Sequence, residues 1–243
     1  SVNYMQADEM SHQAMGYDRA STVFSPDGRL LQVEYARKTI KAGSTAVGVT
    51  CKEGVLLLAD KRIVEKLIVS KSVEKIFQID EHMGATASGI LSDGRILVER
   101  AQVVAQQHRV TYNTPIQTET LVKDVCNTKQ MYTQVGGARP FGVSLMFMGV
   151  GRNPHLFVTD PTGTFFEYKA TAIGEKDDSV KEILNKEYKD NMTFDQALKL
   201  AMSALKRSLG DGFNIDRIDG AYVDAKEKKF KRYSREELSR AFK

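Results

Sequence analysis

Cysteine is scarce in this chain, and long apolar runs are absent from it. The two cysteines, Cys51 and Cys126, are too few for a disulfide scaffold. Each lies in an apolar segment, so we expect buried free thiols in a reducing compartment. No stretch approaches the roughly 20 apolar residues that a membrane span needs. The first twenty residues contain no apolar stretch of the kind that a secretory signal requires. The sequence therefore predicts a cytoplasmic protein that is not integral to a membrane.

The usual sequence patterns of metal and nucleotide sites are also missing. No Cys-x-x-Cys pair occurs, and the four histidines lie far apart in the sequence: His12, His82, His108 and His155. The pair Gly149 and Gly151 lacks the third glycine of a dinucleotide-binding loop and precedes no predicted helix. We therefore expect neither a metal site nor a cofactor.

An excess of charge of one sign is absent as well. The chain has 35 basic and 31 acidic residues, a net charge of +4, which is too mild to indicate a nucleic-acid-binding protein. One basic run, residues 226–232, contains an aromatic residue at Phe230. We interpret this run as the solvated face of a hairpin, and a basic binding module remains the weaker alternative.

The order of predicted elements indicates the fold class. Apolar residues recur at helical spacing in the segment 30–41 and in the longer segments 92–112 and from about 118. Capping boxes predict three more helices, at Ser179–Glu182, Thr193–Gln196 and Ser234–Glu237. The predicted strands are 45–51, 55–59, 75–79, 84–89, 142–148, 156–159, 165–170, 219–224 and 229–233.

Blocks of strands that alternate with pairs of helices suit two packed sheets with helices on the outer faces. We therefore predict an α+β protein with a four-layer αββα sandwich. Residues 1–15 are polar and aperiodic and are predicted to be a mobile tail. No linker divides the rest, so residues 16–243 are predicted to form one domain.

Three residues could supply the chemistry of a self-processing hydrolase. Ser44 starts a strand after a glycine, Asp60 ends the next strand, and Lys75 begins the third. A nucleophile freed by cleavage at Gly43-Ser44 would use its own α-amine as the base. However, the segment 30–41 reads as a well-formed helix and not as a disposable leader. The alternative for Asp60 and Lys75 is an ion pair between adjacent strand ends.

The sequence resembles the proteasome α subunits. The resemblance is strongest in the N-terminal signature, which comprises residues 16–20, 24–30 and 32–36, and it extends over about residues 15 to 240. Further matching stretches are Gly43–Ala46, Ser72–Ile76, Ala105–Gln107, Tyr132–Gln134, Arg139–Gly142 and Glu167–Gly174. Among the α subunits, this sequence is most similar to the archaeal type, in which one α subunit forms a homoheptameric ring. The resemblance implies the fold of N-terminal-nucleophile hydrolases.

The resemblance also implies a role without catalysis. Members of the family form the outer rings of the 20S core particle, where they scaffold β-ring assembly and gate the entry of unfolded polypeptide. They also dock the C-termini of ATPase activator rings. The implied partners are therefore other α subunits, β subunits, activators and substrate, with no nucleic acid and no membrane. A helix after the signature fills the cleft that catalytic subunits leave open, and residues 30–41 match that helix.

Particular residues match the functional positions of the family. The gate matches are Tyr17, Asp18, Arg19, Pro26 and Tyr35. The matches to the activator-binding pocket are Leu30, Gly43, Lys75 and Ile90, with Lys75 as the cation for an activator carboxylate. The matches to the loop that narrows the pore are Gly136, Gly137, Ala138, Arg139 and Pro140. Val135 stands where some relatives have tyrosine, which would make the pore rim less aromatic.

Overall fold

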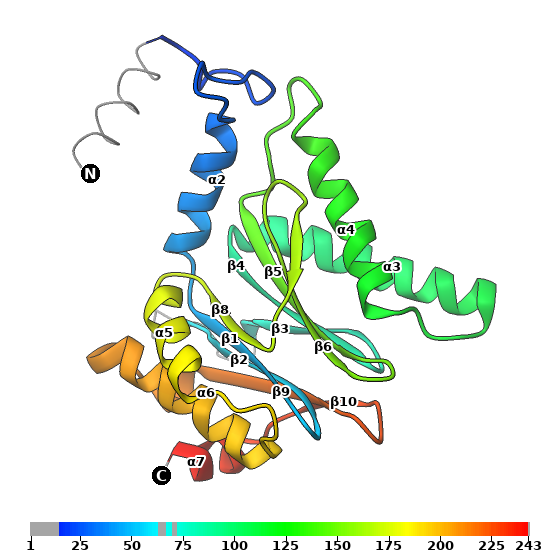
Figure 1. Ribbon diagram of the computed structural model, residues 1–243, viewed down its shortest axis with the longest axis vertical. Coiled ribbons are helices and arrows are strands. Elements are labelled where there is room, and N and C mark those ends of the chain that lie inside the picture. Colours follow the sequence, from blue (N-terminus) through cyan, green and yellow to red (C-terminus); the bar gives the residue numbers. More distant parts are fainter. Residues whose placement is uncertain (1–14, 63–66, 70–71, 243) are drawn as a thin grey trace.

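Two antiparallel five-stranded sheets lie face to face in the computed structural model, which describes residues 15–62, 67–69 and 72–242 (Figure 1). The strand order of the first sheet is β10 (Phe230–Arg232), β9 (Ile218–Asp224), β2 (Gly54–Asp60), β1 (Ala46–Cys51) and β8 (Ala170–Ile173). The order of the second is β3 (Ile76–Asp80), β4 (Met83–Gly89), β5 (Val143–Val150), β6 (Pro154–Thr159) and β7 (Phe165–Glu167).

Helices cover the outer face of each sheet. The first sheet carries α5 (Asp177–Glu187), α6 (Phe194–Leu209) and α7 (Arg235–Phe242). The second carries α3 (Leu91–Tyr112) and α4 (Thr118–Tyr132). Short 3-10 turns at Gly210–Gly212 and Ile215–Arg217 connect α6 to β9. This arrangement confirms the predicted four-layer αββα sandwich.

Strand alternation explains how one chain builds three apolar interfaces. Neighbouring side chains of a strand point to opposite faces of the sheet. In β2, Val55 and Leu57 pack between the sheets, whereas Leu56 and Leu58 pack against the helices of the first sheet. In β5 the residues at odd positions 143, 145 and 147 contact the cluster under α3 and α4, and those at 146, 148 and 150 face the other sheet. Because these strands are buried on both faces, their sequences are continuous apolar runs.

Helix α2 (Leu31–Ala42) lies outside this layering and precedes β1 directly. It buries Leu31, Val33 and Ala36 and contacts β4 and β5. Figure 1 shows it rising from the sheets toward the end of the molecule where residues 15–30 lie. The predicted tail, residues 1–15, falls outside the described residues except for Met15.

Two local predictions are wrong. Residues 165–170 do not form one strand, because the chain crosses between the sheets there: β7 pairs with β6, and β8 pairs with β1. The predicted capping box at Ser179 is not used either, since α5 begins at Asp177 with Lys176 at its N-cap. The capping box of Thr193 and Gln196 forms as predicted.

The buried thiols are as predicted. Cys51 and Cys126 are both free and buried. Burial raises the pKa of both thiols, that of Cys126 to about 11. No helix among the described residues is long and apolar enough to cross a membrane.

Candidate functional site

A tight turn precedes α2, in the part of the chain that carries the N-terminal signature. The amide of Ser25 donates to the Arg29 carbonyl at 2.9 Å, and the amide of Gly28 donates to the Ser25 carbonyl at 2.8 Å. Gly28 has φ +78°, a conformation that favours glycine. The Ser25 hydroxyl donates to the Asp27 carboxylate at 2.5 Å and lowers the pKa of that carboxyl. Pro26 lies exposed in this turn, where its ring fixes φ.

The segment with Tyr17, Asp18 and Arg19 is tied to the first half of α2. The side-chain amide of Gln32 donates to the backbone carbonyl of Asp18 at 2.6 Å. Tyr35 lies one turn further along α2 and is half-buried. Tyr17 and Asp18 are half-buried too, whereas Arg19 is exposed. The predicted gate residues therefore gather at the N-terminal end of α2, and Gln32 joins them although it was not among the predicted gate residues.

The predicted pore loop joins α4 to β5, and a bidentate ion pair fixes one side of it. Arg139 donates to the Asp93 carboxylate at 2.6 and 2.8 Å, and the amide of Gly142 donates to the same carboxylate at 2.9 Å. These donors, Arg139 first, lower the pKa of Asp93. Gly136 and Gly137 are exposed, and Gly137 has φ +83°. Figure 1 shows this loop at the same end of the molecule as residues 15–30.

Lys75 is buried, with 2% of its surface exposed. Its ammonium donates to the Ala87 carbonyl at 3.1 Å. Burial lowers the pKa of Lys75 to about 8, which the attraction of Asp60 opposes. The predicted ion pair between Asp60 and Lys75 does not form. The Asp60 carboxylate instead accepts two hydrogen bonds from Arg217, at 3.0 and 2.6 Å.

Three of the four predicted pocket residues converge on the end of β4. Lys75 donates to Ala87, and Gly43 packs so closely that an added Cβ would lie 2.3 Å from the Gly89 nitrogen. Ile90 follows β4 directly and forms the N-cap of α3. Leu30 lies at the opposite end of α2 from Gly43, about 20 Å away at a rise of 1.5 Å per residue. One copy of the chain therefore cannot place all four residues against a single ligand.

Ser44 follows the C-cap residue of α2, Gly43, and hydrogen bonds hold the backbone on both sides of the Gly43-Ser44 bond. The Gly43 carbonyl accepts from the Glu175 amide at 2.9 Å, and the Ser44 carbonyl accepts from the Ser88 hydroxyl at 3.0 Å. Ser44 itself is 8% exposed. The nitrogen of an uncut Ser44 is an amide and cannot serve as a base. The packing of α2 makes the residues before Ser44 part of the fold.

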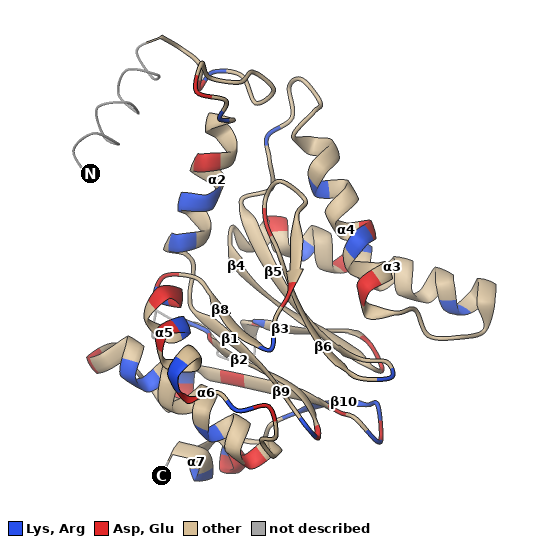
Figure 2. Ribbon diagram, viewed as in Figure 1, with Lys and Arg blue, Asp and Glu red and all other residues tan. Residues whose placement is uncertain are grey.

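The basic run at residues 226–232 forms the turn and second strand of the predicted hairpin. Two of its cations are paired with acids, Lys231 with Glu227 at 2.6 Å and Arg232 with Glu74 at 2.7 Å. Figure 2 shows both signs of charge mixed along this hairpin. This mixing favours the interpretation as a solvated hairpin.

Comparisons with known proteins agree with the sequence motifs. The proteasome subunit family model matches residues 40–223, and the model of the N-terminal signature of A-type proteasome subunits matches residues 17–38. The proteasome alpha subunit of Archaeoglobus fulgidus is 51% identical over 224 residues, 92% of this chain and 91% of the relative. That of Thermococcus sibiricus is 51% identical over 225 residues, 93% and 86% of the two chains. That of Methanothermobacter thermautotrophicus is 50% identical over 227 residues, 93% and 92%.

Proposed function

The chain belongs to the proteasome subunit family and, within it, to the α subunits, and we propose that seven copies form a non-catalytic outer ring of a 20S core particle. One observation supports the absence of catalysis: α2, which ends two residues before Ser44, packs on β4 and β5, so a cut at Gly43-Ser44 would release a helix that is part of the fold. A protein of this kind scaffolds the β ring and leaves peptide cleavage to the β subunits. Its place is the cytoplasm, where it serves intracellular protein degradation.

The gate belongs to the end of the molecule at which residues 15–30 and the loop after α4 lie together (Figure 1). The proposed gate residues are Tyr17, Asp18 and Arg19, which precede the turn that contains Pro26, and Tyr35 in the first half of α2. The hydrogen bond from Gln32 to Asp18 fixes where that segment leaves α2. In a ring, the tails would lie over the axis and the Gly136–Pro140 loops would narrow the channel below them.

Activator docking would use a pocket shared by two neighbouring copies in the ring. Gly43, Lys75 and Ile90 of one copy would form one wall, and Leu30 of the neighbouring copy would form the other. Within a single copy, Leu30 lies at the opposite end of α2 from Gly43. The ammonium of Lys75 would receive an activator's C-terminal carboxylate in place of the Ala87 carbonyl. Since Lys75 is 2% exposed, docking requires that the side chains covering it move.

Mass spectrometry tests the proposal. Native mass of the purified protein should give a heptamer or double heptamer, and intact mass should show no new terminus at Ser44. Ser44→Ala should leave peptide hydrolysis by the assembled α–β particle unchanged. A large loss of hydrolysis in an intact particle, with a chain beginning at Ser44, would instead establish a self-processing hydrolase cut at Gly43-Ser44.

Lys75→Met tests the docking pocket. The variant should still form rings but bind an ATPase ring at least tenfold more weakly, since a hydrogen bond to a charged group contributes about 1.5–3 kcal/mol. Lys129→Met is the matched control, because Lys129 is also buried and its pKa is also about 8, but it belongs to α4 and is not among the predicted docking residues. Equal affinity of the two variants for the activator would remove Lys75 from the site.

A further inference from the structure

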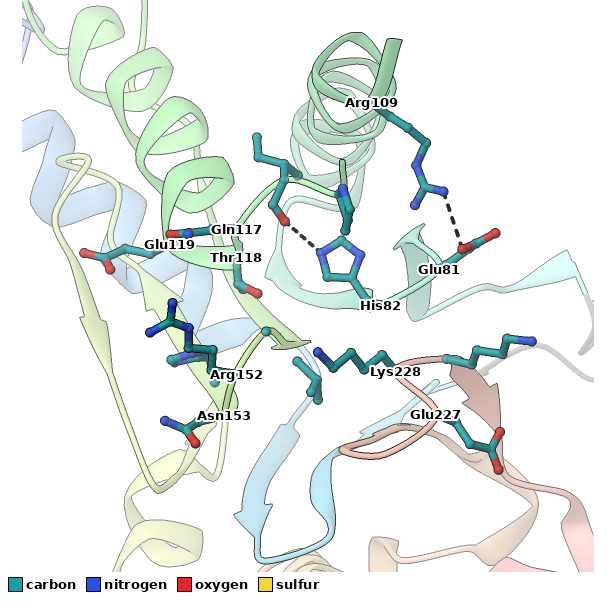
Figure 3. A pocket seen from close by; sticks show the side chains of 16 residues that line it. Glu81, His82, Arg109, Gln117, Thr118, Glu119, Arg152, Asn153, Glu227 and Lys228 are labelled. Carbon is teal, nitrogen blue, oxygen red and sulfur yellow. Dashed lines mark hydrogen bonds and ion pairs between the residues drawn. The ribbon is translucent and has the colours of Figure 1, made fainter. Parts of the chain in front are cut away.

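A cavity of about 710 Å³ lies at the opposite end of β4 and β5 from Gly43 and Ile90. Its walls come from the β3–β4 turn, the start of α4, the β5–β6 turn and the β9–β10 turn, with Arg109 of α3 at one side (Figure 3). A volume of this size is typical of sites for small molecules. None of the gate, pore or docking residues lines it.

The N-terminus of α4 opens into this cavity. Gln117 is the N-cap of this 15-residue helix, and its side chain makes no capping hydrogen bond to the first backbone amides. Thr118, the first residue of the helix, is 3% exposed, and its hydroxyl has no hydrogen-bond partner among the described residues. Figure 3 shows that hydroxyl pointing to the space between His82 and Lys228. Helix N-termini favour anions because of their amides and dipole.

Unsatisfied polar atoms are concentrated at this wall of the molecule. Six buried side-chain atoms lack a hydrogen-bond partner within the described ranges, and four of them belong to Asp80, His82, Arg109 and Thr118. Two of these four, Asp80 Oδ2 and His82 Nδ1, lie 3.6 Å from each other. His82 is fixed by the Ile116 carbonyl, 2.8 Å from its Nε2. Buried polar groups in native proteins are normally satisfied, so the Thr118 hydroxyl, which has no partner among the described residues, is the atom that indicates a missing ligand.

The cations around the cavity are available. Arg152, Lys228 and Lys229 form no ion pair with any other residue that the structure describes. Lys228 has φ +53° in the β9–β10 turn, and Figure 3 shows its amine extending toward the space below His82. Arg152 comes from the β5–β6 turn and the two lysines come from the β9–β10 turn, and all three line the cavity.

The carboxylates around the cavity are mostly neutralised. Glu81 lies 3.5 Å from the Arg109 guanidinium, and Glu227 pairs with Lys231 at 2.6 Å. Glu119 is the third acid in the wall, and Figure 3 shows its side chain directed away from His82. The charge that remains unpaired around the cavity is therefore predominantly positive.

We propose that this cavity binds a small phosphate-bearing anion, with the phosphate at the N-terminus of α4 between Thr118 and Lys228. Phosphate oxygens point in several directions, as do the amides, the hydroxyl and the amine that surround the space. The cavity exceeds what one phosphate fills, so the rest of the ligand lies toward Arg152 and Lys229.

Calorimetry on the purified protein, in the oligomeric form that it takes, tests the site with inorganic phosphate and tripolyphosphate at constant ionic strength. Both probes should bind saturably, with tripolyphosphate tighter if the ligand carries more than one phosphate. Lys228→Gln should weaken binding about tenfold. Lys226→Gln is the matched control, because it removes the same charge from the same turn but does not line the cavity. Equal weakening by both variants, or no saturable binding, would overturn the proposal.

Thr118→Val separates a ligand site from a structural defect. It should weaken phosphate binding several-fold, while the melting temperature in phosphate-free buffer stays equal or rises, because the unpartnered hydroxyl is gone. Unchanged binding by this variant would exclude the α4 N-terminus. Equally tight binding of glutarate, a dicarboxylate without phosphate, would overturn the assignment to phosphate.

Discussion

Lys129 shows at the residue scale how this protein holds a charge in its apolar interior. It has no exposed surface, and its ammonium donates to the Val143 carbonyl at 2.8 Å and to the Thr159 hydroxyl at 3.0 Å. Both partners are neutral, so they compensate the loss of hydration only in part. Burial accordingly lowers the pKa of Lys129 to about 8.

Lys129→Met should change the pH dependence of stability. Between pH 8 and the ordinary lysine pKa of 10.5, the unfolded state binds a proton that the folded state does not. The free energy of unfolding of the wild type should therefore rise relative to the variant, by up to about 1.4 kcal/mol per pH unit. Urea unfolding at pH 7, 8, 9 and 9.5 measures the difference. Parallel curves for the two proteins would show that Lys129 keeps its ordinary pKa.

Sequence reasoning identified charged residues better than it identified their partners. Asp60 and Lys75 were both singled out, but the ion pair considered as the alternative for them does not form: Asp60 binds Arg217, which is 157 positions away. The carboxylate of Asp93, which holds Arg139, was likewise not predicted. Local patterns indicate where a strand ends, but the choice among long-range partners depends on how the sheets stack.

At the scale of elements, Asp93 links the first turn of α3 to the loop that follows α4. Its carboxylate accepts from Arg139 and from the Gly142 amide, so one side chain sets where β5 begins. This link explains why the end of the predicted pore loop that contains Arg139 is held in place, whereas Gly136 and Gly137 are exposed.

Asp93→Asn should destabilise the protein by about 1–3 kcal/mol at pH 7, because it removes the charge from a bidentate pair. The pKa of Asp93 is lowered in the folded state, so its contribution is present above the unfolded pKa and is lost as pH falls through the folded value. The difference should therefore vanish in acid, as urea unfolding across the acid range would measure. Glu99→Gln is the control: its pair with Arg95 is exposed and should contribute under about 0.5 kcal/mol. Equal losses in both variants would contradict the anchoring role.

Element boundaries were predictable where periodicity was strong and not where the chain changes sheets. The alternating apolar residues of β2 and β5 and the capping box of α6 are where the sequence predicts them. Residues 165–170 have uniform strand character, yet β7 and β8 belong to different sheets. Nothing local marks the crossing at Tyr168 and Lys169, since both halves suit an extended backbone.

At the scale of the whole molecule, three apolar interfaces fix the layers, and the proposed functional segments lie at the two ends of α2. The helix spans from the gate residues near its N-terminus to Gly43 at its C-cap. Its length therefore separates the proposed gate residues from Gly43 by about 20 Å within one chain, whereas Leu30, the fourth proposed docking residue, lies at the gate end.

Deleting residues 1–15 should raise basal hydrolysis of small peptides by the assembled α–β particle several-fold. The tail is polar and aperiodic, so it should add little to stability, and the melting temperature should stay within about 1 °C. In a sevenfold ring, removing seven such segments would lower the barrier to entry and leave the β sites unchanged. The gain should shrink once an activator is bound.

Tyr17→Ala is the companion variant, because it keeps the tail but removes a side chain at the point where the segment meets α2. It should reduce activator-stimulated hydrolysis and leave basal hydrolysis near the wild-type rate. Peptide hydrolysis by particles of each variant, with and without an ATPase ring, measures both effects. An unchanged basal rate in the truncated particle would show that these residues do not limit entry, and the gate would then have to be sought in the Gly136–Pro140 loop.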